Sequence, residues 1–397
     1  MRPSLRSYAD YRERLRGMSM PLAFVDLELL LWNAANLVER AGGRPIRLAS
    51  KSIRCREVLR RVMATSEIFK GVLCFSAEEA AHLAGDGFDD LVVAYPTVDA
   101  RGIAAVCRRI AEGAQICLMI DEAGHLPPIA AAALEHGVEV PVAIDLDMST
   151  RFPGLHFGVR RSPVWDVAGA LALAEIVART PRVRLDGVMG YEAQIAGLRD
   201  RTPGQTLKSA AVRALKKRSD RELRARRAAI VAALREAGHT LRFVNGGGTG
   251  SVESTRDDAS VTELAAGSGL YGPVLFDGYD AFQPLPAAGF ALPVVRRPTG
   301  GIYTCYAGGW IASGSAGPDR LPRPYLPADA RLLPTEGAGE VQTPVTCDTV
   351  LSLGDPVLFR HAKAGELCEH VRELVLLAAD GTCERVPTYR GDGFCFA

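Results

Sequence analysis

The first residue that could do covalent chemistry is a lysine near the start of the chain. Lys51 follows a short apolar run, 47–50, in the segment Arg-Leu-Ala-Ser-Lys-Ser. A lysine amine can form a Schiff base with a carbonyl compound when it is partly removed from water. Lysines at strand ends are also common as solvated loop residues. By itself, Lys51 leaves a catalytic and a solvated role open.

Two glycine-rich segments follow two later apolar runs. They are Asn-Gly-Gly-Gly-Thr-Gly-Ser at 245–251 and Gly-Ser-Gly-Leu-Tyr-Gly at 267–272. Successive glycines allow backbone N–H groups to approach a phosphate closely, and the hydroxyls of Thr249, Ser251 and Ser268 add donors. Each segment alone could be a tight turn. Two of them on adjacent strands favour a phosphate site.

The elements that position these residues follow a repeating order. Between residues 47 and 271, short apolar runs alternate with longer, alanine-rich periodic segments, the pattern of a β-strand followed by an α-helix. Eight strands are predicted, at 47–50, 71–75, 90–95, 115–120, 138–145, 185–191, 241–245 and 263–270. Helices are predicted at 54–65, 77–85, 99–112, 122–136, 163–179 and 220–237. Eight such units predict a (β/α)8 barrel, with a doubly wound open sheet as the alternative.

The sequence changes in character after Tyr271. Prolines and glycines become frequent, and short alternating runs appear at 301–307, 344–351, 356–360 and 373–377. This pattern is typical of a mostly β domain. We therefore predict an α/β barrel domain with an N-terminal helix at 1–283 and a C-terminal, mostly β domain at 284–397.

Composition excludes several classes of partner. The 397 residues include 47 Lys+Arg and 46 Asp+Glu, so a net charge of +1 gives no general attraction to nucleic acid or to an anionic membrane. The apolar stretches are far shorter than the ~20 residues of a membrane span. Nine cysteines without a Cys-x-x-Cys pair, and no secretory signal in the first twenty residues, predict reduced thiols in a cytoplasmic protein.

In the predicted barrel, Lys51 and the two glycine segments lie around one mouth. This arrangement is appropriate for pyridoxal 5'-phosphate, which needs an amine partner and a phosphate anchor. The chain resembles the fold-type III pyridoxal phosphate enzymes, the superfamily of alanine racemase, D-threonine aldolase and D-serine dehydratase. The matching segments are 25–27, 49–51, 145–151, 187–191, 246–249 and 267–272, in that order.

The resemblance implies a role for each matching residue. Lys51 would form the Schiff base with the cofactor, and Tyr191 would lie near the cofactor ring. The residues around the phosphate would be Gly248, Thr249, Gly250, Gly267, Ser268 and Tyr271. Arg151 would point into the pocket, with an exposed loop position as the alternative. Residues 264–266 are Leu-Ala-Ala where racemases place an arginine against the pyridine nitrogen, so racemase activity loses support.

A second departure concerns metal binding in the predicted β domain. Aldolases and dehydratases of this superfamily have a His-x-Cys or His-x-Asp pair that binds a divalent metal. Here His361 is followed by Lys363, whose ammonium cannot ligate a metal, so either the metal is lost or Glu366 or Cys368 replaces the ligand. We expect activity without a metal. The resemblance assigns His361 as the base that accepts the substrate hydroxyl proton, kept neutral by Lys363; a polar turn is the alternative.

The resemblance also implies the reaction and the assembly. The predicted reaction is aldol cleavage of a small β-hydroxy-D-amino acid similar to D-threonine. Dehydration or deamination of a D-serine-like substrate and racemisation are alternatives. A non-enzymatic carrier of pyridoxal phosphate would correspond to the barrel alone, so the additional β domain argues against it. The implied homodimer has the β domain of one subunit closing the barrel mouth of the other.

One basic segment is not explained by these assignments. Residues 208–227 contain nine Lys or Arg and only Asp220 and Glu222 as acids. Contact with nucleic acid is conceivable, but no aromatic residue is interleaved to stack on bases. The pattern favours a solvated basic helix.

Overall fold

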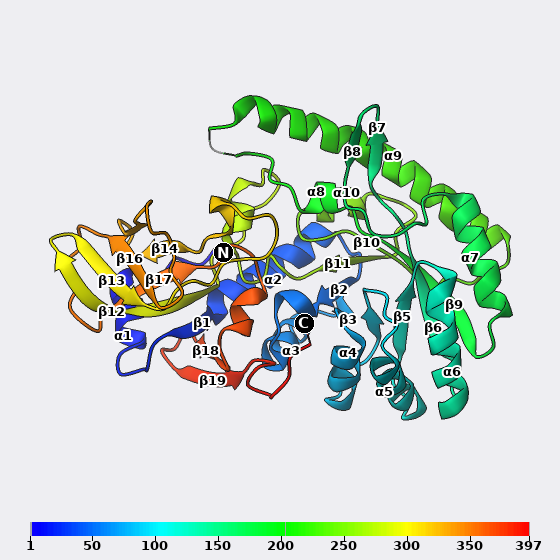
Figure 1. Cartoon of the computed structure of the whole chain (residues 1–397), viewed down its shortest axis with the longest axis horizontal. Helices are drawn as coiled ribbons and strands as arrows, with labels where there is room; N and C mark the ends of the chain where they lie inside the picture. The colour runs from blue at the N-terminus through cyan, green and yellow to red at the C-terminus, as the bar shows by residue number, and fades with distance from the viewer. Residues whose placement is uncertain (1, 203, 397) are drawn as a thin grey trace.

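A closed barrel of eight parallel strands forms the larger part of the computed structural model, which describes residues 2–202 and 204–396 (Figure 1). The strands are β2 Ile46–Ala49, β3 Phe69–Cys74, β4 Leu91–Val93, β5 Ile116–Ile120, β6 Val140–Asp145, β9 Val183–Gly190, β10 Phe243–Gly246 and β11 Glu263–Ala266. Each overlaps one predicted strand. The barrel closes where β11 pairs with β2, with Leu264 opposite Ile46. This pairing confirms the barrel and excludes the open sheet.

Helices cover the outside of the barrel. They are α2 Leu27–Ala41, α3 Arg56–Met63, α4 Ala77–Gly85, α5 Ala100–Ala111, α6 Leu126–His136, α7 Val167–Arg179, α9 Thr206–Glu236 and the short α10 Val252–Arg256. The short helix α8, Ala193–Ala196, lies at the mouth of the barrel instead. Side-chain oxygens of Asp26, Ser76, Asp99 and Asp166 cap the first turns of α2, α4, α5 and α7. These caps satisfy N–H groups that have no partner within the helix. A hairpin of β7 Thr150–Phe152 and β8 Leu155–Phe157 between β6 and α7 was not predicted.

Apolar side chains and buried ion pairs fill the interior of the barrel. Val92, Met119 and Phe243 belong to one buried cluster. Arg47, which is 1% exposed, donates from Nε to Glu263 at 2.7 Å, so its buried charge is paired. The filled interior leaves the C-terminal ends of the strands as the place for a cavity. At this end β11 stops at Ala266 rather than at the predicted residue 270, because the glycine segment begins there.

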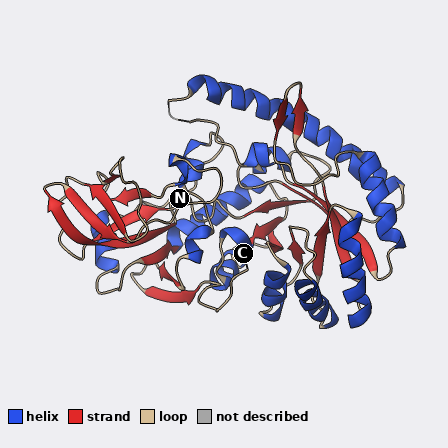
Figure 2. Cartoon of the chain, viewed as in Figure 1, coloured by secondary structure: helices blue, strands red, loops and turns tan. Residues whose placement is uncertain are grey.

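A second sheet lies at one end of the molecule (Figure 2). Its strands are β1 Leu22–Asp26, β12 Ala288–Thr299, β13 Ile302–Tyr306, β14 Arg323–Leu326, β15 Arg331–Leu332, β16 Gln342–Thr346, β17 Pro356–Arg360, β18 Glu373–Leu377 and β19 Cys383–Pro387. The mostly β character expected for the C-terminal part is confirmed. The N-terminal strand β1 is part of this sheet, between β12 and β18. The domain boundary at 283 stays a prediction, and the chain enters the barrel only after β1.

Two helices differ from their predictions. The opening helix α1, Tyr8–Arg14, is shorter than the helix at 8–18 that the sequence suggests. The basic segment is part of the single long helix α9, but it is not wholly solvated, because Lys216 and Arg227 are buried in ion pairs. Among residues 2–202 and 204–396, no helix has both the length and the hydropathy needed to span a bilayer.

Candidate active site at the barrel mouth

A cavity of about 530 Å³ lies at the C-terminal ends of the barrel strands. Of the residues predicted from the sequence, Lys51, Tyr191, Gly248, Thr249, Gly267 and Ser268 line it. They come from β2, β9 and the segments after β10 and β11, which are distant in sequence. The structure therefore brings the predicted amine and most of the predicted phosphate-binding residues to one cavity.

Lys51 lies in a short 3-10 turn, Ser50–Ser52, directly after β2. Its Nζ donates a hydrogen bond to the phenol oxygen of Tyr95 at 2.5 Å. Burial by itself raises the pKa of Tyr95, but the charge and hydrogen bond of Lys51, together with Arg161, outweigh it and lower the pKa overall. The phenol of Tyr95, just after the end of β4, is thus held against the amine of Lys51. Sequence reasoning missed Tyr95, although it is the last residue of the predicted strand 90–95.

The two glycine segments are linked to each other through Thr249. Its Oγ1 accepts from the N–H of Gly269 at 3.2 Å and from the hydroxyl of Ser268 at 3.1 Å. The N–H groups of Thr249, Gly250 and Ser268 have no acceptor among the residues that the structure describes. Unpaired N–H groups from two adjacent segments at a cavity are the donors that a phosphate needs.

Most glycines in these segments are needed because other parts of the chain pack too close for a side chain, and not because the backbone turns there. A Cβ on Gly267 would lie 2.7 Å from the carbonyl oxygen of Ala49, and one on Gly269 would lie 2.5 Å from Cγ2 of Thr249. Only Gly247 (φ +83°) and Gly272 (φ +61°) adopt the left-handed conformation that favours glycine. The segments are thus more than two tight turns, since their packing brings backbone into contact around the cavity.

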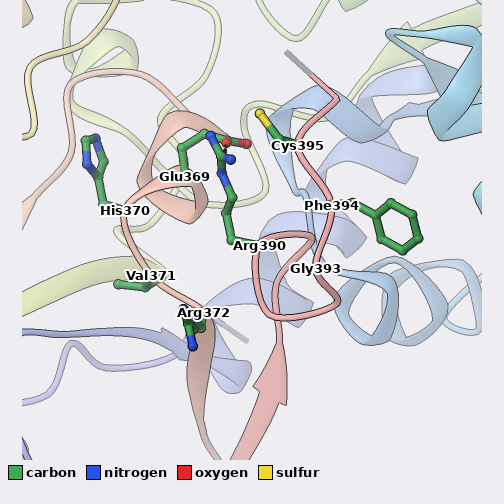
Figure 3. Close-up of a pocket in the computed structure, with 8 residues that line it drawn as sticks. All are labelled: Glu369, His370, Val371, Arg372, Arg390, Gly393, Phe394 and Cys395. Carbon is green, nitrogen blue, oxygen red and sulfur yellow. Dashed lines mark hydrogen bonds and ion pairs between the residues drawn. The ribbon is translucent and has the colours of Figure 1, made fainter.

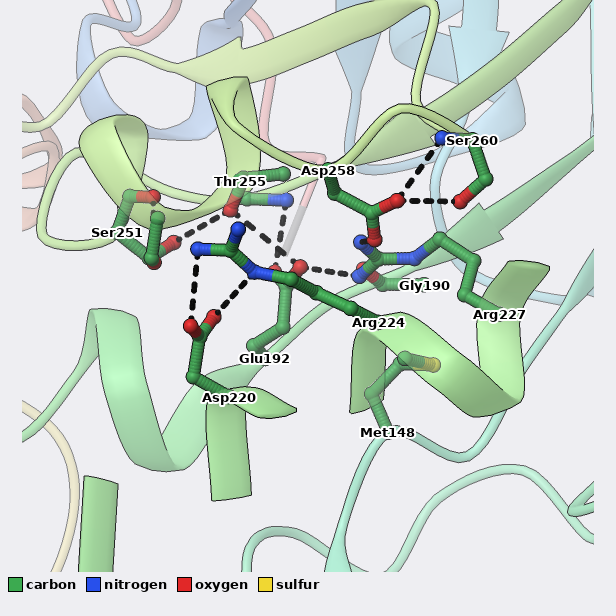
Figure 4. Close-up of polar contacts among 12 residues, drawn as sticks. Met148, Gly190, Glu192, Asp220, Arg224, Arg227, Ser251, Thr255, Asp258 and Ser260 are labelled. Atoms are coloured by element: carbon green, nitrogen blue, oxygen red, sulfur yellow. Dashed lines mark hydrogen bonds and ion pairs between the residues drawn. The ribbon is translucent and has the colours of Figure 1, made fainter. Parts of the chain in front are cut away.

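A buried ion-pair network supports the first glycine segment from behind (Figure 4). Glu192 accepts from the N–H of Gly247 at 2.8 Å and also binds the guanidinium of Arg227. Arg227 donates to Asp258 at 2.7 Å and is 1% exposed. The network ties the end of β9 to the segment after β10. It corrects the interpretation of the basic segment, because Arg227 is buried to pair with two carboxylates.

Two phenols and a guanidinium form one side of the cavity. The Arg161 guanidinium carbon lies 5.8 Å from the ring centre of Tyr191 and 5.9 Å from that of Tyr95. Burial raises the pKa of Tyr191 to about 12, so the phenol stays protonated at neutral pH. Arg161 lies in the segment between β8 and α7, where sequence periodicity gives no signal, and it was not predicted.

Asp145, at the end of β6, lines the same cavity. Burial and then the charge of Asp121 raise its pKa to about 7, against the opposing effect of Arg161. The carboxyl therefore changes charge close to neutral pH. A group of this kind inside a cavity is typical of functional sites.

We expect Asp145 to make the stability of the cofactor-free protein depend on pH. Its pKa is about 7 when folded and 3.8 ordinarily, so between these pH values the folded state binds more protons than the unfolded state. Its contribution to the free energy of unfolding therefore falls as pH rises through this range. Urea unfolding at several pH values should show a smaller decline in Asp145→Asn. The exposed control Asp348→Asn should match the wild type; equal slopes in all three would contradict the expectation.

The remaining predicted residues do not line the cavity. Arg151 lies on β7 with 62% of its side chain exposed and stacks on Trp165 at 3.9 Å. Tyr271 is fully buried and donates to the carbonyl of Ile53 at 2.9 Å. A Cβ on Gly250 would clash with the backbone of Ala196. The exposed position that was the alternative for Arg151 is the one observed.

His361 is 4% exposed and lies behind the cavity wall, with its ring perpendicular to that of Tyr271. Burial, followed by the charge of Arg360, lowers its pKa to about 3. The imidazole is neutral, as expected, but the cause differs from the expected repulsion by Lys363. Its catalytic role stays a prediction.

The β-sheet part of the same chain supplies one wall of the cavity. Ser313, Arg320, Lys363 and Glu366 line it. The chain's own residues therefore contribute to this wall, and closure of the mouth by the β domain of a second subunit stays a prediction. The homodimer itself stays a prediction.

The two candidates for a replacement metal ligand have other contacts. Cys368 is buried, which raises its pKa, and its thiol donates to the carbonyl of Ile53 at 3.2 Å. Glu366 accepts from the N–H of Ser313 at 2.9 Å. No helix spans residues 361–368, since Gly365 adopts φ +94°. Within the described part of the chain, no group of three or more His, Cys, Asp or Glu side chains is arranged to hold a metal ion.

A second cavity, of about 430 Å³, lies near the C-terminus between residues 369–372 and 390–395 (Figure 3). Its main carboxylate, Glu369, already binds both Arg54 and Arg390. The residues that line this cavity include no lysine and no glycine-rich segment. The barrel mouth is therefore the better candidate for chemistry.

Comparison with known proteins gives relatives of similar sequence. The D-threonine aldolase of Arthrobacter sp. is 28% identical over 248 residues, 60% of this chain and 58% of the relative. The 3-hydroxy-D-aspartate aldolase of Paracoccus denitrificans (strain Pd 1222) is 24% identical over 198 residues, 50% of this chain and 46% of the relative. The chain thus matches only about half the length of these relatives.

One solved structure shares the fold of this chain, and one protein family matches its barrel. The crystal structure of D-threonine aldolase from Filomicrobium marinum superposes with a TM-score of 0.80 at 20% identity, covering 95% of this chain and 97% of that one. This likeness shows a common fold. The family of the alanine racemase N-terminal domain matches residues 25–274, which include the barrel, Lys51 and both glycine segments. The chain therefore belongs to the alanine racemase N-terminal domain family.

Proposed function

We propose that this protein is a pyridoxal 5'-phosphate-dependent lyase that cleaves the Cα–Cβ bond of a β-hydroxy-D-amino acid. One observation carries the proposal: a single cavity of about 530 Å³ has the amine of Lys51 at one strand end and unpaired N–H groups of two glycine segments at others. The names of the relatives, aldolases of D-threonine and of 3-hydroxy-D-aspartate, support this reaction class.

The residues present are appropriate for the cofactor. Lys51 would hold its aldehyde carbon covalently, and the N–H groups of Thr249 and Ser268, which line the cavity, would donate to its phosphate, with Gly250 proposed beside them. Tyr191 would lie beside the ring. The cofactor supplies an electron sink for the charge left at Cα when the bond to Cβ breaks.

The protein's own groups would position the reacting atoms. Tyr95 fixes the amine of Lys51, and Arg161 offers a cation beside it for the substrate α-carboxylate. The proton of the substrate hydroxyl needs an acceptor. We propose His361 for this step on the resemblance. Its imidazole is neutral, but because its pKa is about 3 and it does not line the cavity, it would have to move toward the substrate and gain basicity to accept the proton. Arg151 is retained as a second proposed catalytic residue on the resemblance alone.

Product analysis tests the proposed reaction. Protein loaded with pyridoxal phosphate should convert D-threonine, or another β-hydroxy-D-amino acid, into glycine and an aldehyde, with EDTA present throughout. A 2-oxo acid with ammonia would identify a dehydratase instead, and the L-enantiomer as the product would identify a racemase. The absence of any product from a panel of β-hydroxy-D-amino acids would contradict the proposal.

A further inference from the structure

Asn245 is a buried asparagine that lines the cavity at the barrel mouth. It is the residue before the last one of β10 and is 1% exposed. Its Nδ2 donates to Oε1 of Glu263 at 2.8 Å, and Glu263 also accepts from Nε and Nη2 of Arg47 at 2.7 and 2.9 Å. These contacts fix the orientation of the carboxamide, because its oxygen in the place of Nδ2 would face a carboxylate.

The oxygen of this carboxamide has no partner. In the part of the chain that the structure describes, no donor lies within hydrogen-bond distance of Oδ1 of Asn245. Asn245 lines the cavity and Glu263 does not, so the Oδ1 end of the carboxamide is the one on the cavity side. The neighbouring strand β11 adds only the apolar side chains of Ala265 and Ala266 to the lining. A buried acceptor of this kind is destabilising unless a ligand supplies a donor.

The cofactor proposed for this cavity has one ring atom that can supply the donor. The ionised phosphate and phenolic oxygens of pyridoxal phosphate accept hydrogen bonds, whereas its ring nitrogen donates when it is protonated. Lys51 follows β2, and the glycine segments follow β11 and β10, which are consecutive strands of the barrel. A cofactor that joins Lys51 to these segments would therefore lie over the part of the cavity that Asn245 and Ala265 line.

We propose that Oδ1 of Asn245 accepts a hydrogen bond from the protonated ring nitrogen of pyridoxal phosphate. This inference rests on the proposed function, because it requires that cofactor in the cavity. The hydrogen bond favours the charged form of the ring and so raises the pKa of the ring nitrogen. The charge of Glu263 strengthens the acceptor, since it polarises the carboxamide through Nδ2. A protonated ring is the better electron sink for the charge left at Cα.

The test compares pyridoxal phosphate with its deaza analogue, in which a C–H group replaces the ring nitrogen. Both have the same aldehyde and phosphate, and each is titrated into the cofactor-free protein, with dissociation constants read by isothermal titration calorimetry. The ratio of the two constants in the wild type is compared with the ratios in Asn245→Leu and in the smaller Asn245→Ala. The preference for pyridoxal phosphate should fall by about 10 to 100 times in both variants, as expected for one hydrogen bond to a charged group.

Two further variants separate the hydrogen bond from packing. Asn245→Asp keeps an acceptor oxygen in the same place, because its other oxygen can hold a proton and donate to Glu263. It should retain most of the preference. Asn33→Leu is the matched control, since Asn33 is 4% exposed but bonds to the carbonyls of Leu270 and Leu285 and does not line the cavity. It should change the affinities for both cofactors by the same factor.

A spectroscopic measurement reports the ring nitrogen directly. At one fixed pH, the ¹⁵N resonance of a ring-labelled cofactor should lie nearer to the pyridinium value in the wild type than in Asn245→Leu or Asn245→Ala. Identical resonances in these proteins would overturn the assignment of Asn245.

The two titrations also distinguish the possible failures. An unchanged ratio in Asn245→Leu and Asn245→Ala, including equal weakening of both cofactors, makes Asn245 a structural residue and overturns the inference while leaving the proposed function intact. Failure of the wild type to bind either cofactor overturns the proposed function itself.

Discussion

The Lys51→Ala variant should lose at least about three orders of magnitude in turnover of the β-hydroxy-D-amino acid. The variant removes the Lys51 amine, which would hold the cofactor and could also transfer protons at the substrate. A positioned proton-transfer group alone contributes about 10² to 10⁴-fold to the rate. The steady-state rate of glycine formation measures the loss. The protein should also fail to develop the yellow colour of the bound cofactor.

Lys363 provides the critical comparison, because it is a second amine in the same cavity. Lys363→Met should keep the yellow colour and the covalently bound cofactor. Lys51 is favoured as the attachment point since it is fixed by Tyr95 directly at the end of β2, whereas Lys363 lies in the irregular segment after β17 and is held by Ser313. Turnover in Lys51→Ala within tenfold of the wild type would contradict the assignment.

The Arg227→Met variant should lose about 3 to 5 kcal/mol of folding free energy, because it leaves the carboxylates of Glu192 and Asp258 buried without their partner. Both of these carboxylates are less than 5% exposed in their side chains. The free energy of unfolding in urea measures the loss. The cofactor should also bind more weakly, since Glu192 holds the N–H of Gly247.

A neighbouring arginine on the same helix provides the matched control. Arg224 pairs with Asp220, and both side chains are partly exposed, at 32% and 25%. Arg224→Met should therefore cost no more than about 1 kcal/mol. Similar small losses in Arg224→Met and Arg227→Met would show that the buried network does not support the glycine segment.

Local sequence signals predicted the barrel strands and the glycine segments well. Each strand is an apolar run with a polar or glycine boundary, and glycine-rich segments are recognisable without tertiary information. The choice between barrel and open sheet required the pairing of β11 with β2, two strands that are more than 200 residues apart in sequence. The role of β1 was missed because its five buried residues pair with strands from the far end of the chain.

Site residues were missed where tertiary packing alone determines their environment. Arg161 and Arg320 lie in irregular segments, where neither periodicity nor spacing indicates which side chain reaches a cavity. Arg227 belongs to a strongly basic run, and its two buried partners come from other elements. Burial of His361 likewise depends on its packing against Tyr271 and the segment after β11, which the residues around it in the sequence do not reveal.

Reduction of the holoprotein with borohydride, followed by tryptic mapping, tests the central claim most directly. Because trypsin cleaves after Arg47 and Arg54 but not at a modified lysine, a cofactor fixed to Lys51 should appear in the peptide 48–54. Attachment to Lys363 would instead label the peptide 361–372. We expect the label on 48–54 and none in Lys51→Ala. A label on 361–372, or an unlabelled protein that pyridoxal phosphate cannot reconstitute, would contradict the account.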